Sequence, residues 1–435
     1  MPVGYGHNKM NILIISAPDP YKVAGTVAYN LYKGLNEKGH NTKLLVNTYG
    51  NYPDPGIFCM QTKTDVLVKK AKNRVLKTLD KFFKVLPKKD KDYSIQDYDE
   101  TKTHYKTSAL LKKINFKPEV ILFLFPQNFL NAKNLYELNK QTGAHIYWYL
   151  MDSAALTGGC HYSWDCRRFT TGCGKCPGLY SNDENDQTAV NFRFKNHYIS
   201  QTSISIVSAT EWQYRLSLGS LLFKEKAMDK ILLSVDQHIF KPAPKDDAKR
   251  KYGIPVNKKV IFFGSAFLGE RRKGMRYLMD ALKLVKQQGN IINNDILLLI
   301  AGNDFELIKN DIPFEYKYMG LLANNEELAE AFQASDIYIC PSIEDSGPMM
   351  INQAIMCGIP SVTFDMGVAM DLVLNGKTGY RAKLMDVNDL AKGISTLLAL
   401  DDDTYKQYSI NCRELALSTC TPEVQIDQFE KLFTQ

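Results

Sequence analysis

Four cysteines are crowded into seventeen residues near the middle of the chain: Cys160, Cys166, Cys173 and Cys176. Their spacing, Cys-x5-Cys-x6-Cys-x2-Cys, ends in a Cys-x2-Cys pair of the kind that binds zinc. Glycines at positions 158, 159, 172 and 174 permit the tight turns that a metal knuckle requires. We expect a structural zinc bound by the four thiols, with free buried thiols or disulfides as the alternative.

A second group of polar and small residues lies where an apolar run gives way to a helical pattern. Its members are Glu344, Asp345, Gly347, Pro348, Met349 and Gln353. The two acids can accept hydrogen bonds, and the free backbone amides at the start of the helix can bind phosphate. The glutamine, one turn into the helix, both donates and accepts hydrogen bonds. A plain loop–helix junction is the alternative.

Two cations, Arg272 and Lys273, stand at the start of another helical pattern. Positive charge is unfavourable at a helix N-terminus unless an anion offsets it. This cost favours a phosphate-binding role over a solvated pair of charges. Ser265 lies earlier in the same expected loop, which follows the apolar run 260–263.

These groups are positioned by apolar runs of the kind that form strands buried on both faces. In the first half they cover 11–16, 40–46, 120–125, 146–150 and 204–207, with a loop at Gly25 and a helical pattern over 26–38. In the second half they cover 260–263, 296–300, 337–340 and 360–363, and alternate with helical patterns over 274–288, 326–334 and 349–356. Two such series predict an α/β protein with two Rossmann-like, doubly wound lobes.

We expect an N-terminal lobe over 1–240, which includes the basic segment 63–91 and the cysteine insertion 158–177. A second lobe covers 241–415, after a linker that contains Pro242-Ala-Pro244. A C-terminal helix, 416–435, is expected to return to the first lobe. The lobes would face a cleft at the carboxyl ends of both sheets, where ligands bind in open α/β folds.

The net charge of +7 is concentrated in one segment. Residues 63–91 hold eleven Lys and Arg against three Asp, a local charge of +8, so the rest of the chain is near neutral and nucleic acid is not an expected partner. Between Thr64 and Leu86, apolar residues fall on one helical face: Val68, Ala71, Val75, Leu79, Phe82 and Leu86. Such a helix either lies on an anionic membrane or packs on the first lobe with a solvated basic face.

The chain contains no stretch of about 18 apolar residues, and its first residues lack the apolar region of a signal peptide. The five remaining cysteines are scattered, as in a protein with reduced thiols. We therefore expect a cytoplasmic protein, which is peripheral on the inner membrane face if the basic segment is the membrane-binding one of the two alternatives.

The stretch from Pro341 to Pro360 resembles the donor-site signature of glycosyltransferase family 4, which has the GT-B fold. In that alignment Asp345 takes the place of the first acid, with Glu344 beside it, and Gln353 replaces the usual second Glu. The stretch Gly264–Gly274 resembles the family's post-strand loop, whose basic residues contact the donor diphosphate. Here Ser265 stands where many members have Arg.

Two more segments extend the resemblance over most of the chain. Ser234–Pro242 resembles the family's interlobe segment, and Val23-Ala-Gly25 resembles its first-lobe glycine loop. Asp152–Pro177 looks like an insertion found in some bacterial capsule and exopolysaccharide transferases, which usually carry His-Asp where this chain has Met151-Asp152. A first-lobe His often faces the donor sugar, so Asp152 or His161 is expected to compensate.

The resemblance implies a retaining hexosyl- or related transferase that moves a sugar from a nucleotide-diphosphate donor to a glycan or lipid-linked acceptor. It implies no catalytic metal, so Arg272, Lys273 and the Gly347 amides would stabilise the leaving diphosphate. Asp152, Asp345, Glu344 and Lys273 are the candidate catalytic residues. A nucleotide-sugar epimerase of the same fold and an inactive binding protein stay open as alternatives. No Gly-x-Gly-x-x-Gly follows a strand, which argues against a dinucleotide oxidoreductase.

Overall fold

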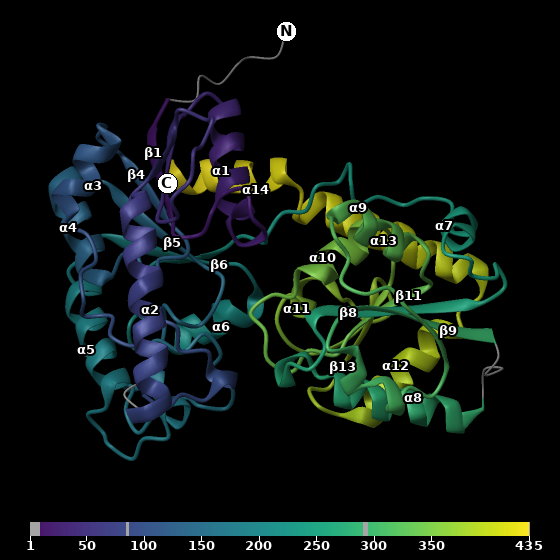
Figure 1. Cartoon of the computed structure of the whole chain (residues 1–435). Helices are drawn as coiled ribbons and strands as arrows, with labels where there is room; N and C mark the ends of the chain where they lie inside the picture. Colours follow the sequence, from purple (N-terminus) through teal and green to yellow (C-terminus); the bar gives the residue numbers. More distant parts are fainter. Residues whose placement is uncertain (1–8, 84–86, 290–294, 435) are drawn as a thin grey trace, which may run out of the picture. The chain divides into compact units, whose positions relative to one another are not determined.

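The computed structural model describes residues 9–83, 87–289 and 295–434, and the chain forms two compact units (Figure 1). Unit 1 comprises Met1–Ser208, Gln213–Ile231 and Ile426–Gln435. Unit 2 comprises Ala209–Trp212 and Leu232–Gln425. Each unit is built around one parallel sheet, as the two series of apolar runs predict.

Unit 1 contains a seven-stranded sheet in the order β3-β2-β1-β4-β5-β6-β7, with every neighbouring pair parallel. The strands are β1 Asn11–Ser16, β2 Asn41–Val46, β3 Ile57–Cys59, β4 Val120–Phe123, β5 His145–Leu150, β6 Ile204–Ser208 and β7 Met228–Lys230. The helices lying wholly or mostly in this unit are α1 Thr26–Glu37, α2 Lys63–Phe83, α3 Thr107–Ile114, α4 Ala132–Thr142, α5 Gln187–Ile199, α6 Glu211–Gly219 and α14 Pro422–Phe433. Residues Ile12 to Ile15 are fully buried, as expected of a strand covered on both faces.

Most of helix α14 belongs to unit 1, where it packs against residues that are distant from it in sequence. Its Glu430 accepts a 2.9 Å contact from His40, and both side chains are buried. The hydroxyl of Tyr147 on β5 donates to the carbonyl of Leu432 at 3.0 Å, and the ring of Tyr149 lies 5.2 Å from that of Phe429. The end of the chain therefore completes the hydrophobic core of this unit.

The basic amphipathic helix is present as α2, one long helix of unit 1 (Figure 1). Its apolar side chains are open to solvent: Leu67, Val68 and Val75 are 59%, 61% and 57% exposed. Leu86 lies outside the described residues, as do the side chains of Phe82 and Phe83. No helix in the described part of the chain is long and apolar enough to cross a membrane.

Unit 2 contains a six-stranded sheet in the order β10-β9-β8-β11-β12-β13, again parallel throughout. The strands are β8 Lys259–Phe267, β9 Ile296–Asn303, β10 Glu315–Tyr318, β11 Ile337–Cys340, β12 Ser361–Phe364 and β13 Gly379–Ala382. The helices are α7 Lys245–Lys251, α8 Met275–Gln288, α9 Asn325–Gln333, α10 Met349–Met356, α11 Ala369–Leu372, α12 Val387–Leu398 and α13 Asp402–Thr419.

Both sheets reverse their strand order beside their first strand, between β1 and β4 in unit 1 and between β8 and β11 in unit 2. Loops that leave the carboxyl ends of two such strands diverge and leave a crevice, which is where ligands bind in open α/β sheets. In unit 2 these loops carry Arg272, Lys273 and Asp345. Three of the residues that the sequence motifs single out therefore lie at this edge of the sheet.

Candidate functional site

The turn between β8 and α8 depends on a glycine. A short 3-10 turn, Arg271–Lys273, ends at Gly274, whose φ of +68° lies in the left-handed region. A Cβ at this position would lie 1.8 Å from the carbonyl oxygen of Pro341. The backbone amide of Ile343 donates to the carbonyl of Arg272 at 2.8 Å, which fastens the turn to the loop after β11. The close approach of these two loops sets the geometry of the site.

Two cations of this turn converge on one carboxylate. Arg272 Nη1 and Lys273 Nζ each lie 2.6 Å from Asp345 Oδ2, and Arg272 Nη2 lies 2.7 Å from Glu270 Oε2. Burial alone would raise the pKa of Asp345, but the charges of Lys273 and Arg272 outweigh it and hold the pKa below its usual value. Asp345 is therefore ionised near neutral pH and is the anion that offsets both cations.

The loop after β11 leads directly into α10, which begins at Met349 as predicted. The amide of Gly347 donates to Asp345 Oδ1 at 3.3 Å. Pro348 occupies the N-cap position without a side-chain cap, so the first amides of the helix are open to an anion. The hydroxyl of Thr210 donates to the carbonyl of Ser346 at 2.7 Å and holds the loop; no pattern in the sequence indicates this contact.

The structure gives three other residues predicted for the donor site, Glu344, Gln353 and Ser265, different surroundings from one another. Glu344 is buried, and its amide lies 3.4 Å from the carbonyl of Arg272. Gln353 is half-buried, and among the described residues its side chain makes no hydrogen bond. Ser265 lies inside β8 instead of in the expected loop, because β8 pairs with β9 as far as Phe267 through an irregular register. Its hydroxyl donates to the carbonyl of Phe267 at 2.7 Å.

An open depression with an empty volume of about 1350 Å³ lies beside the cationic turn. Glu270, Arg271 and Gly274 line it from the turn, and Ile343 lines it from the loop after β11. The rest of its lining comes from the start of α8 and from the segment after β9, where Leu307, Ile308 and Asp311 lie.

In unit 1 the structure brings together Asp152 and His161, which the sequence analysis offers as alternative replacements for the missing first-lobe His. His161 Nδ1 lies 2.9 Å from Asp152 Oδ2, and Asp152 Oδ1 accepts from the amide of Ala154 at 2.8 Å. The imidazole is 7% exposed, and its Nε2 has no hydrogen-bond partner among the described residues. Asp152 thereby fixes the orientation of the ring and leaves one buried nitrogen for another group.

At Gly25, the glycine of the first-lobe loop, the backbone packing leaves no room for a side chain. It is buried at the end of a short turn, Val23–Gly25, before α1, and its amide donates to the carbonyl of Lys22 at 2.7 Å. A Cβ here would lie 2.0 Å from the carbonyl oxygen of Asp19. Its role in donor binding stays a prediction.

The four cysteines of the insertion line one small cavity. All four are free thiols, and the amide of Gly158 donates to Cys173 Sγ at 3.2 Å. Burial raises the pKa of Cys173 to about 12 and also raises the pKa of Cys160, so both are neutral thiols without a cation. Within the described residues, no three Cys, His, Asp or Glu side chains are already grouped to hold a metal ion.

Residues 244–415 match the family described as Glycosyl transferases group 1, which supports a domain of that family in less than half of the chain. N-acetyl-alpha-D-glucosaminyl L-malate synthase from Bacillus anthracis is 21% identical over 232 residues, which cover 52% of this chain and 59% of that protein. UDP-Gal:alpha-D-GlcNAc-diphosphoundecaprenol alpha-1,3-galactosyltransferase from Escherichia coli is 25% identical over 228 residues, covering 49% and 57%. The chain thus spans less than two thirds of the length of these relatives.

Among solved structures, sucrose-phosphate synthase from Thermosynechococcus elongatus is similar to the whole chain. The TM-score is 0.67 at 16% identity, and the match covers 98% of this chain and 99% of that one. At this identity the likeness concerns the fold alone. The fold is the two-domain GT-B fold, as predicted.

The glycine between β8 and α8 supplies a test of the site's geometry. Gly274→Ala introduces a clash with Pro341 as well as a strained φ, whereas Gly253→Ala introduces only the strain, since nothing lies within 4 Å of its Cβ position at φ +64°. We expect Gly253→Ala to lower the free energy of unfolding by about 1 kcal/mol. Gly274→Ala should lower it by about 1–3 kcal/mol more. Chemical denaturation followed by circular dichroism measures both, and equal losses would contradict the described contact.

Proposed function

We propose that this chain is a glycosyltransferase that moves a hexose or related sugar from a nucleoside-diphosphate sugar to a glycan or lipid-linked acceptor. The observation that carries the proposal is the convergence of Arg272 and Lys273 on Asp345, beside the uncapped start of α10. This arrangement lies in the part of the chain that matches group 1 glycosyl transferases. Two cations and open helix amides suit a diphosphate better than any neutral ligand.

The chemistry of transfer requires that the leaving diphosphate be stabilised as it gains negative charge. We assign this task to Arg272, Lys273 and the amides after Gly347. In the nucleotide-free protein Asp345 neutralises these cations, so an incoming diphosphate competes with an internal carboxylate. Once displaced, Asp345, with Glu344 beside it, is available to accept hydrogen bonds from hydroxyls of the donor sugar.

The finer features of the reaction follow from the family 4 resemblance. We propose retention of the anomeric configuration, with Gln353 bound to the ribose hydroxyls of the nucleotide. Gln353 suits this role because its amide has no other hydrogen bond among the described residues. The Asp152–His161 pair of unit 1 is assigned to sugar hydroxyls, with the unpartnered Nε2 as its acceptor.

We further propose a role in cell-envelope polysaccharide or glycoconjugate synthesis, of the capsule and exopolysaccharide type. The cysteine insertion supports it by resemblance. The name of the Escherichia coli relative supports it too, since that enzyme uses a UDP-sugar and a lipid-linked acceptor. The Bacillus anthracis relative is named for an L-malate product, so the comparisons leave room for small acceptors as well.

Replacement of Lys273 tests the donor site. Lys273→Ala should weaken UDP or GDP binding by about 1–3 kcal/mol, the scale of a charged hydrogen bond, as measured by calorimetry. Lys283→Ala is the matched control, because among the described residues this lysine on α8 pairs only with the exposed Asp311, at 2.8 Å. Unchanged affinity in Lys273→Ala would contradict the assignment. UDP binding without transfer or hydrolysis of any donor sugar would favour a binding protein, and conversion of the donor without acceptor would favour an epimerase.

We propose that α2 attaches the protein reversibly to an anionic membrane surface. Apolar side chains are usually buried in a helix that packs on its own domain, yet Leu67, Val68 and Val75 are more than half exposed. Lysines share the helix with them, at 69, 70, 72, 77 and 81; the side chain of Lys77 lies outside the described residues. Each basic residue near anionic lipid contributes about 1 kcal/mol, so a few of them give attachment without insertion.

Vesicle sedimentation tests this attachment. Wild type should sediment with anionic vesicles at low salt and be released at high salt or with neutral lipid, because salt screens the attraction. Changing Lys69, Lys70 and Lys81 to Glu should abolish sedimentation and leave UDP affinity intact. The matched control changes three exposed lysines elsewhere in unit 1, Lys112, Lys113 and Lys117, and should still sediment. If wild type ignores anionic vesicles at low salt, the helix is only a solvated face.

A structural zinc in the cysteine insertion is the last part of the proposal. The four thiols line one small cavity, as the ligands of a single zinc ion would. In the described part of the chain they are not grouped closely enough to hold an ion, so zinc binding would require the thiols to move together. Zinc would also favour the thiolates that burial otherwise disfavours. We expect about one zinc per chain in protein purified without chelator, and loss of zinc together with a lower melting temperature in Cys173→Ser. Zinc near zero in the wild type would refute this.

A further inference from the structure

The segment between Asp152 and His161 is a closed loop that lies outside the helices and strands of unit 1. The backbone amide of Ser153 donates to the carbonyl of His161 at 3.0 Å, so the two ends of the loop meet. Ser153, Ala154 and Thr157 are buried. Buried backbone carbonyls outside regular secondary structure need hydrogen-bond donors from elsewhere in the protein. The geometry of the Asp152–His161 pair therefore depends on what holds this loop.

Lys195 on α5 supplies two of these donors. Its ammonium donates to the carbonyl of Ala154 at 2.6 Å and to that of Thr157 at 2.9 Å. The residue is only 3% exposed, so both bonds form away from solvent. A third contact, of 2.8 Å, joins the ammonium to Glu100 Oε2 and balances its charge. These three contacts use the three donors of the ammonium, so Lys195 is committed to the loop and not to a ligand.

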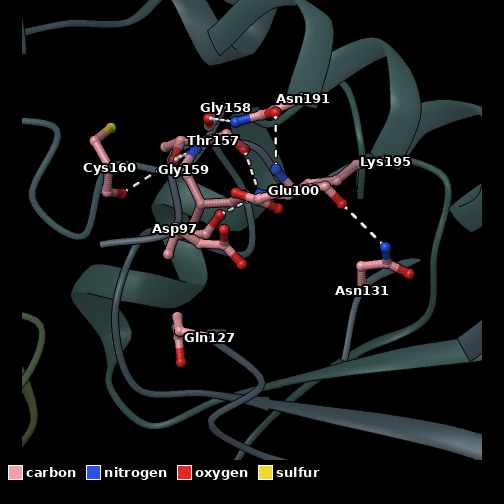
Figure 2. Close-up of polar contacts among 12 residues, drawn as sticks. Asp97, Glu100, Gln127, Asn131, Thr157, Gly158, Gly159, Cys160, Asn191 and Lys195 are labelled. Atoms are coloured by element: carbon pink, nitrogen blue, oxygen red, sulfur yellow. Dashed lines mark hydrogen bonds and ion pairs between the residues drawn. The ribbon is translucent and has the colours of Figure 1, made fainter. Parts of the chain in front are cut away.

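Asn191 lies one helical turn before Lys195 and holds the same loop. Its Nδ2 donates to the carbonyl of Gly158 at 3.1 Å (Figure 2) and to that of Tyr98 at 3.0 Å. Its Oδ1 accepts from the backbone amide of Glu100 at 3.1 Å. Residues four apart lie on one face of a helix. One face of α5 therefore fastens both the loop and the segment that carries Glu100.

Helix α5 is itself firmly placed. The side chain of Asp186 caps its start by accepting from the amides of Thr188 and Ala189. Phe192 and Ile199 belong to the hydrophobic core of unit 1. The helix therefore offers a fixed support from which side chains can hold a loop.

The shape of the loop determines which ring nitrogen of His161 carries the proton. Asp152 Oδ2 lies 2.9 Å from Nδ1 of the ring. A carboxylate only accepts hydrogen bonds, so Nδ1 carries the proton and Nε2 presents a lone pair. The backbone of Asp152 is held in turn by Gln213, whose Nε2 donates to its carbonyl at 2.6 Å. With that end fixed, the position of His161 depends on the part of the loop that α5 holds.

We propose that Lys195, with Glu100 as its counter-ion, is the positioning residue of the Asp152–His161 pair and keeps Nε2 of His161 as a hydrogen-bond acceptor. The inference rests on the proposed function in assigning that pair to sugar hydroxyls. A merely structural ion pair would need only balanced charge, whereas positioning needs the bonds from Lys195 to the carbonyls of Ala154 and Thr157. Variants that remove these bonds and keep the charge balanced therefore distinguish the two roles.

The test reads the tautomer of His161 by NMR of the full chain labelled with 15N-histidine, recorded at mildly alkaline pH. His161→Gln identifies the signals of this ring among the seven histidines. Wild type should show the Nδ1–H tautomer, and Lys195→Met should lower its share by about half or more. The double variant Lys195→Met/Glu100→Gln should show the same fall without leaving a buried unpaired charge, which covers the case in which Lys195→Met fails to fold. Arg193→Met is the matched control on the same helix, because Arg193 is exposed and donates to Asn185 at 3.1 Å.

An Nε2–H tautomer in wild type, or an unchanged tautomer in the double variant, would overturn the proposal. So would an equal fall in Arg193→Met, since any change on α5 would then disturb the ring. Calorimetry with UDP, whose proposed site lies in unit 2, separates these outcomes from failure of the transferase function. If the tautomer shifts as expected and wild type binds no UDP, the positioning role stands and the donor site is wrong. If UDP binds and the tautomer does not shift, the donor site stands and the positioning role is wrong.

Discussion

The organisation of unit 2 depends on one carboxylate shared between two cations. Arg272 and Lys273 stand at a helix start, where positive charge is unfavourable, and both reach the same oxygen of Asp345. The contact joins the loops that follow β8 and β11, the two strands at which the sheet reverses its order. One interaction therefore serves two purposes: it offsets the positive charge at the helix start and joins the two loops.

Much of the fold could be predicted because fully buried parallel strands leave continuous apolar runs in the sequence. The strand Asn11–Ser16 and the helix Met349–Met356 were predicted with the bounds they have. Sequence patterns fail where pairing continues beyond the apolar run, as in β8, whose last residues pair with β9 although they are exposed. They also miss the edge strands Ile57–Cys59 and Met228–Lys230, because three residues are too few to show a recognisable pattern of apolar and polar side chains.

The site was predictable in its residue types but not in its pairings. The sequence identifies both the cationic turn and the acid before α10. It does not indicate that the two touch, because about seventy residues separate them in the chain. The family resemblance likewise offered Asp152 or His161 as a replacement for the missing His, whereas the folded insertion makes them partners.

The return of α14 to unit 1 bears on the order in which the protein folds. A ribosome delivers N-terminal segments first, and a domain made of contiguous residues folds as soon as it emerges. Unit 1 lacks that option, since buried His40 pairs with Glu430 and Tyr147 bonds to the backbone at Leu432. Its core stays open during synthesis of the whole of unit 2. Of the two units, the one that begins earlier in the chain is then completed later, and the nascent chain carries exposed apolar surface until α14 is released.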